Sequence, residues 1–148
     1  QSMELSETEK LNFAIIRGSK AYEEWDRQQG MPAYLTIILY ELLLRKRLTQ
    51  KDLVYLSDLP KQSINKGIHR LLEKDYLKLT IDPDDNRVKY CQLTESGKKY
   101  AKEKMTPLFE IENKVAQKMG AQKMKQLVAL NEEWSETFWR FLRKKGEK

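Results

Sequence analysis

The chain has 148 residues, which fits one domain of ordinary size, and 40% of them are hydrophobic, which is enough for a core. Its net charge of +6 suggests a polyanionic partner, although a modest positive charge also serves plain solubility. A single cysteine, Cys91, excludes an intramolecular disulfide and favours a reducing compartment, and no apolar run is long enough to span a bilayer.

The first two helices are marked by start and stop signals. Ser6 and Glu9 form an S-x-x-E capping box, which predicts a helix that ends near Gly30. Residues 32–46 then carry apolar side chains on almost every side of a helical wheel. A helix of this kind is buried on most sides, so we expect it at the centre of the domain.

Two shorter helices follow. The sequence T-Q-K-D from Thr49 to Asp52 is a second capping box, and Pro60 marks the turn into the next helix. That helix has one apolar stripe, formed by Ile64, Ile68, Leu71 and Leu72. Asn65 lies on the flank of the stripe, and the residues on the opposite side are Gln62, Lys66, His69, Arg70 and Glu73.

A hairpin is predicted next. Apolar residues alternate on both sides of "DPDDN", which has the composition of a tight turn. Cys91 shares a face of the second strand with Leu93, so we expect it to be buried and chemically inert. After the hairpin, Thr94 opens a long helix, and Gly120 separates this helix from the last one.

This order of elements predicts a mainly α fold in which a helix-turn-helix is followed at once by a β-hairpin wing. The second helix of such a motif lies in the DNA major groove, where glutamine and asparagine bond adenine and lysine reaches guanine or phosphate. The wing would bring Arg87 to the minor groove, whose negative potential attracts arginine. The plain alternatives are an ordinary surface helix and a solvated turn, and an aspartate that pairs with Arg87 could also brace it for insertion. The candidate partners are Asp82, Asp84 and Asp85.

The charge is distributed as a nucleic-acid-binding lobe requires. Residues 1–30 carry four basic and six acidic side chains, whereas residues 45–104 carry fifteen basic and nine acidic ones. The second segment therefore has a net charge of +6, equal to that of the whole chain. Binding to phosphates through this segment would be strongly dependent on salt.

At this point the sequence resembles the MarR family of bacterial transcription regulators. The motifs that carry the resemblance are "LTQKDL", "LPKQSIN…LLEKDYL", "DPDDNR" and "LTESGKKYA". They correspond to the family's helix-turn-helix and to its D-x-R wing, which runs into L-T-x-x-G. The helical flanks agree, so the resemblance extends from about Leu5 to the end of the chain.

The resemblance implies a single domain over residues 1–148, with a DNA-binding lobe at about 32–98 and dimerisation helices at about 5–30 and 99–145. It implies an obligate homodimer on pseudo-palindromic double-stranded operators, acting as a ligand-responsive repressor in the cytoplasm. The residues expected to contact DNA are Thr49, Gln50, Lys61, Gln62, Ser63, Asn65, Lys66, His69, Arg70 and Arg87.

Two positions depart from the family pattern. The family usually has glycine after the recognition helix, where this chain has Asp75, and aspartate can adopt the left-handed conformation at some cost. Gly67 lies inside the recognition helix, where glycine destabilises by up to ~1 kcal/mol relative to alanine. It either permits a close approach or merely softens the helix.

Aromatic residues and the family's ligands suggest two further features. The last helix contains several large aromatic residues within a short span. A homodimer interface would use them, although some could close the monomer's own core. They are Trp134, Phe138, Trp139 and Phe141.

Regulators of this family are commonly released from DNA by small aromatic ligands, bound between the dimer helices and the DNA-binding lobe. The candidate pocket residues are Trp25, Tyr34 and Tyr40, each of which could equally be core.

Other classes of function have weak support. The sequence contains no nucleophile–base motif and no phosphate-cradling glycine loop, so we do not expect an enzyme. One histidine and one cysteine make no zinc cluster, so we expect no metal and no cofactor. The main alternative to a DNA-binding regulator is a winged helix that binds a partner protein without specific DNA binding.

Overall fold

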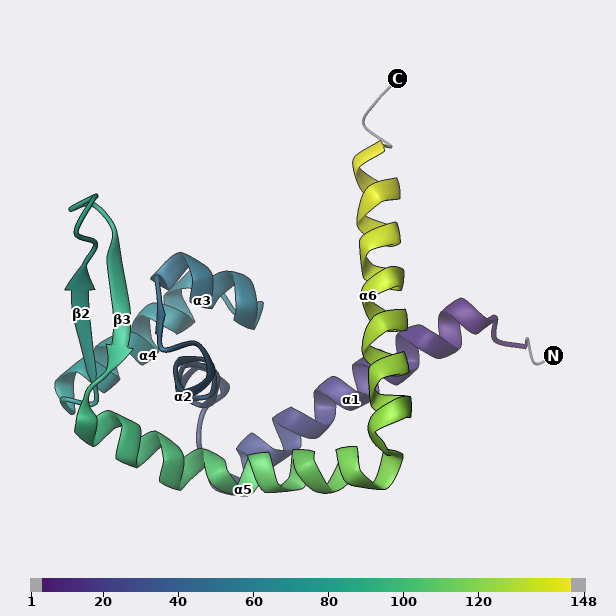
Figure 1. Ribbon diagram of the computed structural model, residues 1–148, viewed down its shortest axis with the longest axis horizontal. Coiled ribbons are helices and arrows are strands. Elements are labelled where there is room, and N and C mark those ends of the chain that lie inside the picture. Colours follow the sequence, from purple (N-terminus) through teal and green to yellow (C-terminus); the bar gives the residue numbers. More distant parts are fainter. Residues whose placement is uncertain (1–3, 145–148) are drawn as a thin grey trace. The chain divides into compact units, whose positions relative to one another are not determined.

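The computed structural model describes residues 4–144, and its elements are six helices and three short strands (Figure 1). The described part divides into two compact units, one ending at Thr106 and the other beginning at Pro107. Within residues 4–144 we find no helix with the length and apolar character needed to cross a membrane. The helices are α1 (Glu7–Gln29), α2 (Ala33–Arg45), α3 (Gln50–Ser57), α4 (Lys61–Glu73), α5 (Glu95–Met119) and α6 (Ala121–Lys144).

The ends of α1 lie where the sequence predicts the helix to start and to stop. The Ser6 hydroxyl accepts a hydrogen bond from the Glu9 backbone N–H at 3.3 Å, as an N-cap residue does. At the other end Gly30 has φ 66°, in the left-handed region, and its N–H donates to the Arg27 carbonyl at 3.1 Å. Glycine ends a helix in this way because it has no Cβ to clash.

Helix α2 lies at the centre of the first unit, as its composition predicts. Ile38 and Leu39 are fully buried, and the helix contacts α3, α4 and the sheet. The helix is buried on most sides, as expected, and the exception lies at its C-terminal end, where Leu44 is 57% exposed. Glu41 is buried instead, and its carboxylate accepts a hydrogen bond from Arg45 at 2.8 Å.

Helices α3 and α4 form the predicted helix-turn-helix. The capping box of α3 has both of its bonds at 3.0 Å, from the Asp52 N–H to the Thr49 hydroxyl and from the Thr49 N–H to the Asp52 carboxylate. The stripe of α4 is buried at Ile64, Ile68 and Leu71, whereas Leu72 is half-buried.

Gly67 permits the close approach of α4 to α2. A Cβ at this position would lie 2.6 Å from Ile38 Cδ1 and 3.1 Å from the Tyr34 carbonyl oxygen. The first contact would force the end of the Ile38 side chain to move, and the second is tighter than most Cβ contacts, so a larger residue would strain the packing of α4 on α2. The glycine therefore has a packing role and does not simply soften the helix.

The sheet has one more strand than the sequence predicts. Strands β2 (Leu77–Ile81) and β3 (Lys89–Leu93) form the expected hairpin, and β1 (Arg47–Leu48) pairs with the other side of β3. A two-residue strand shows no alternation that a sequence could reveal, so its pairing depends on where α2 ends. Figure 1 shows β2 and β3 running side by side from the α5 end to the turn.

A network of backbone contacts joins α4, β2 and α5. Asp75 has φ 59°, and the Tyr76 N–H donates to the Leu71 carbonyl at 2.9 Å, which completes a left-handed helix end at the position where glycine is usual. The Thr94 hydroxyl donates to the Asp75 carbonyl and accepts from the Gly97 N–H at 3.0 Å. Thr94 therefore caps α5 and holds it against the end of α4.

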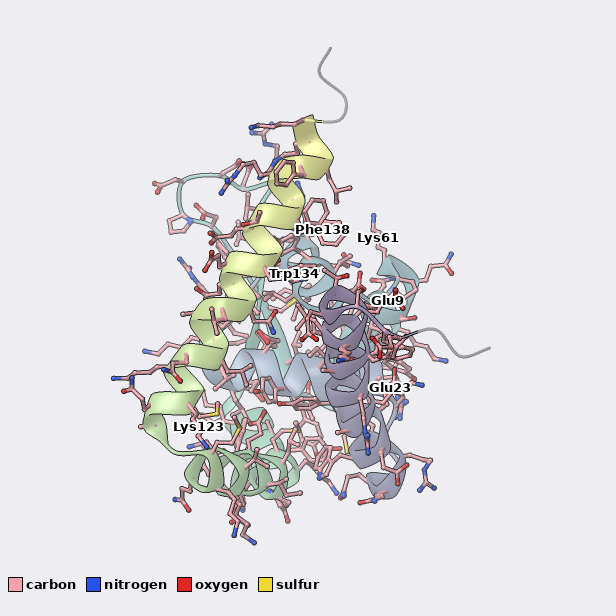
Figure 2. All side chains as sticks on the ribbon, turned by 90° about the vertical axis from the view of Figure 1, so that its right-hand side faces the viewer. Glu9, Glu23, Lys61, Lys123, Trp134 and Phe138 are labelled. Atoms are coloured by element: carbon pink, nitrogen blue, oxygen red, sulfur yellow. The ribbon has the colours of Figure 1, made fainter. Side chains whose placement is uncertain are left out.

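The second unit consists of the end of α5 and all of α6. None of the described residues of α6 is buried, although the helix contains two tryptophans and two phenylalanines. Trp134 and Phe138 lie one turn apart and make an edge-to-face contact with ring centroids 5.7 Å apart (Figure 2). Phe141 and Trp139 are more than half exposed. An apolar surface of this extent on a single helix is unusual for a soluble chain that has no partner.

Candidate nucleic-acid interface

The outward face of α4 is polar along its whole length. Burial of its apolar stripe against α2 and α3 leaves the opposite side in solvent, because the two faces of a helix are fixed by its 3.6-residue period. The predicted contact residues on this exposed side are Lys61, Gln62, Asn65, Lys66, His69 and Arg70. Ser63 is half-buried at the edge of this face.

The start of α4 leaves backbone donors available. Pro60 occupies the N-cap position, and among the described residues no side chain caps this end. The Ser63 N–H turns back to the Pro60 carbonyl at 3.0 Å, whereas the N–H groups of Lys61 and Gln62 precede the first helical bonds. Donors at a helix N-terminus attract phosphate, so this end suits contact with a nucleic-acid backbone.

One flank of α4 is tied to the beginning of α3. The Gln50 side-chain amide donates to Asn65 Oδ1 at 3.4 Å. Thr49 precedes Gln50, and its hydroxyl serves as the α3 cap. The structure thus brings together three residues that the sequence assigned to DNA contact, and it orients Asn65 through its neighbour.

The other flank of α4 packs on Tyr34, which from the sequence was a candidate for either a ligand pocket or the core. Arg70 Nη1 donates to the Tyr34 hydroxyl at 2.9 Å, and Lys66 Nζ lies 5.6 Å from the centre of the Tyr34 ring. Both cations are thereby held along the α2 side of α4. The Tyr34 side chain is therefore part of the α2–α4 contact.

In the wing, the aspartate that pairs with Arg87 is Asp85. Asp85 accepts two hydrogen bonds from the Arg87 guanidinium, at 3.0 and 3.2 Å, and a third from the Arg87 backbone N–H at 3.0 Å. These bonds lower the pKa of the Asp85 carboxyl below its ordinary value, the side-chain bond contributing most. Asp82 instead orders the turn, because its Oδ1 accepts the N–H groups of Asp84 and Asp85 at 2.8 and 3.2 Å.

The remaining candidates lie away from this surface or inside the unit. Trp25 is buried at 6% exposure, and Tyr40 is half-buried on α2. Cys91 is buried, and desolvation raises the pKa of its thiol to about 11, which suppresses the reactive thiolate at neutral pH. Among residues 4–144 no group of three or more histidine, cysteine, aspartate or glutamate side chains is placed to hold a metal ion.

Two residues near the wing have no role in the sequence prediction. The Arg47 guanidinium lies over the Tyr90 ring, with 4.2 Å from Cζ to the ring centre, and the Tyr90 hydroxyl donates to Asp82 Oδ2 at 2.9 Å. Tyr90 could have been noticed as an aromatic residue on the outward face of its strand. Arg47 gave no signal, because its neighbour in space belongs to a strand more than forty positions later.

Several solved structures, transcription regulators among them, have a similar fold. This chain is similar to a MarR family regulator from Neisseria meningitidis, with 23% identity and a TM-score of 0.82 over 95% of this chain and 99% of that one. It is similar to NadR in complex with 4-hydroxyphenylacetate, with 21% identity and a TM-score of 0.72 over 90% and 95% of the two chains. The values for S. aureus MepR in its DNA-binding conformation are 16% and 0.71, over 90% and 99%. Neither a family model nor a curated protein matches the sequence. The chain therefore has the winged-helix fold of MarR regulators.

Proposed function

We propose that this chain belongs to the MarR family and is a cytoplasmic, homodimeric repressor that binds double-stranded DNA. The observation that carries the proposal is the outward face of α4, whose polar residues are oriented by α2 and α3 in the same unit that bears an arginine-tipped wing. This combination has the two elements that reading both grooves of DNA requires.

The recognition helix would read the major groove with its first two turns. Gln62 and Asn65 have the amide groups that bond adenine, and Lys61 and Lys66 would reach guanine or phosphate. Arg70 and His69 lie nearer the C-terminal end and would contact phosphate, as would Thr49 and Gln50 at the start of α3. Each neutralised phosphate should contribute about −0.9 to the slope of log affinity against log salt.

The wing would present Arg87 to the minor groove. Its side chain is 87% exposed although it is held by Asp85, so the guanidinium is both ordered and accessible. Transfer of Arg87 from this exposed pair to DNA should be easy, because exposed ion pairs contribute about 0–1 kcal/mol. The pair would hold the guanidinium at the turn until a DNA group replaces Asp85 as its partner.

Homodimerisation would cover the apolar residues that the isolated chain exposes. On α6 these include Leu127, Leu130, Phe138 and Phe141, which are between 48% and 64% exposed, and on α1 Phe13 is 60% exposed. A stable interface buries about 800 Å² per partner over roughly 20–30 residues, so these side chains would form its apolar centre. The two recognition helices of a dimer should then lie about 34–36 Å apart to enter successive major grooves.

The effector would be a small aromatic compound. NadR, which has the same fold, is known in complex with 4-hydroxyphenylacetate. Tyr34 offers a direct route for regulation, because a ligand that moved its ring would disturb the contact with Arg70 on the recognition helix. Trp25 and Tyr40 would complete the proposed pocket.

Selection of bound DNA from a random pool tests the site. We would compare the wild type with Asn65→Ala and Arg87→Ala, and use Lys10→Ala on α1 as a control that removes an exposed charge from a weak surface pair. Asn65→Ala should change the selected bases, whereas Arg87→Ala should lower affinity and the preference for A·T-rich flanks. The control should select the same DNA as the wild type.

Three results would contradict the proposal or part of it. Unchanged selection by both variants would remove α4 and the wing from the site, and a wild type that binds no DNA at low salt would favour a protein-binding winged helix. Analytical ultracentrifugation that shows a monomer at micromolar concentration would exclude the homodimer.

A further inference from the structure

The outward face of the sheet carries a series of contacts that leads from β1 to the turn of the wing. Arg47 pairs with Gln92 in the register of β1 and β3, and Tyr90 lies two residues before Gln92 on the same face of β3. The Arg47 side chain therefore reaches diagonally across the strand, and its Cζ lies 4.2 Å from the centre of the Tyr90 ring. A cation over an aromatic ring at this distance is attracted to it.

Asp82 links Tyr90 to the turn of the wing. The Tyr90 hydroxyl donates to Asp82 Oδ2, while Oδ1 of the same carboxylate holds the N–H groups of Asp84 and Asp85. The pKa of the Asp82 carboxyl is lowered by the Asp84 N–H first and by the Tyr90 hydroxyl next, so this carboxylate is ionised at neutral pH. Asp85 in turn holds Arg87 through its own carboxylate.

We propose that Arg47 and Tyr90 are positioning residues of the wing, which hold Asp82 and thereby the turn that presents Arg87. Arg47 then affects DNA affinity through Tyr90 and not as a phosphate contact of its own. This inference depends on the proposed DNA-binding function. A wing ordered before binding loses less conformational entropy when DNA arrives, which favours association.

The first experiment needs no DNA. Amide hydrogen exchange of Asp84 and Asp85, measured by NMR, reports directly on the bonds to Asp82. Tyr90→Phe keeps the ring under Arg47 but removes the hydroxyl, and we expect roughly three- to tenfold faster exchange, as for the loss of one hydrogen bond. Tyr55→Phe is the matched control, because Tyr55 is 85% exposed on α3. Unchanged exchange in Tyr90→Phe would overturn the inference.

Substitutions of Arg47 separate its charge from its contact with the ring. Arg47→Gln should speed exchange of the same amides, whereas Arg47→Lys, which keeps a cation over Tyr90, should stay near the wild-type rate. The double variant with Tyr90→Phe should show less than the product of the single effects, because both residues act through one path. Independent effects would contradict that path.

The second experiment measures DNA affinity over a range of salt concentrations. Tyr90→Phe and Arg47→Gln should both weaken binding about three- to tenfold without changing the salt slope. If Arg47 contacts a phosphate itself, Arg47→Gln alone would reduce the slope by about 0.9, and the inference would be wrong. A wild type that binds no DNA would overturn the proposed function and the DNA part of this inference. The exchange experiment tests separately whether Arg47 and Tyr90 hold the turn.

Discussion

Replacement of Gly97 by alanine would bring a methyl group into collision with the backbone of Tyr76, which lies between α4 and β2. The new Cβ would lie 1.8 Å from the Tyr76 carbonyl oxygen, so that oxygen would have to move by roughly 1.2 Å or more to reach a tolerable distance. The oxygen accepts the Thr94 N–H at 3.1 Å, and the preceding Asp75 carbonyl accepts the hydroxyls of Thr94 and Ser96. The movement would therefore break this whole set of bonds.

The cost can be estimated from the bonds that the shift would break. Three hydrogen bonds at about 1 kcal/mol each and the stacking of Tyr76 on Tyr100, at about 1 kcal/mol, add to roughly 4 kcal/mol. The better helix propensity of alanine offsets up to ~1 kcal/mol. We expect Gly97→Ala to lower the free energy of unfolding by about 3 kcal/mol, which is a fall in Tm of roughly 6–12 °C for a chain of this size.

Urea unfolding followed by circular dichroism measures this change, with all proteins at one concentration because association adds to stability. Ser96→Ala is the matched control. It removes one of the hydroxyls that donate to the Asp75 carbonyl without adding a methyl group against the Tyr76 backbone, and it should cost about 1 kcal/mol. A Gly97→Ala protein as stable as the wild type would refute the steric reasoning.

Three further predictions concern single residues. Asp75→Gly should raise the free energy of unfolding by about 0.5–1 kcal/mol in the same assay, because φ 59° suits glycine better than aspartate. Cys91 should resist alkylation by iodoacetamide at pH 7.5 in the native protein and react after denaturation, because the pKa of the buried thiol is about 11. In an NMR titration Asp85 should show a pKa below its ordinary value, and Arg87→Ala should return it toward that value. Because this pKa is lowered in the folded state, the Asp85–Arg87 pair should be fully formed above the ordinary aspartate range and be lost as the pH falls through the lowered pKa. A normal Asp85 pKa in the wild type would contradict the pairing.

Much of the fold could be predicted because its signals are local. The caps at Ser6 and Thr49, the buried stripe of α4 and the tight turn of the wing each depend on residues within a few positions of one another. Periodicity also separated the outward face of α4 from its packed face, whereas the assignment of that face to DNA came from the helix-turn-helix order and the family resemblance. The contacts that orient the residues of that face did not follow from either.

The sequence by itself determined which segments are helical, which face of α4 is polar and that one arginine ends the wing. Only the tertiary structure decided that β1 joins the sheet, that Gly67 and Gly97 lie where another backbone crosses, and that Asp85 holds Arg87. The physical reason is the separation along the chain of the residues that interact. Hydrogen bonds and periodicity within an element are set by neighbours in the chain, whereas the contact between Tyr34 and Arg70 joins residues 36 positions apart and exists only once α2 and α4 have packed.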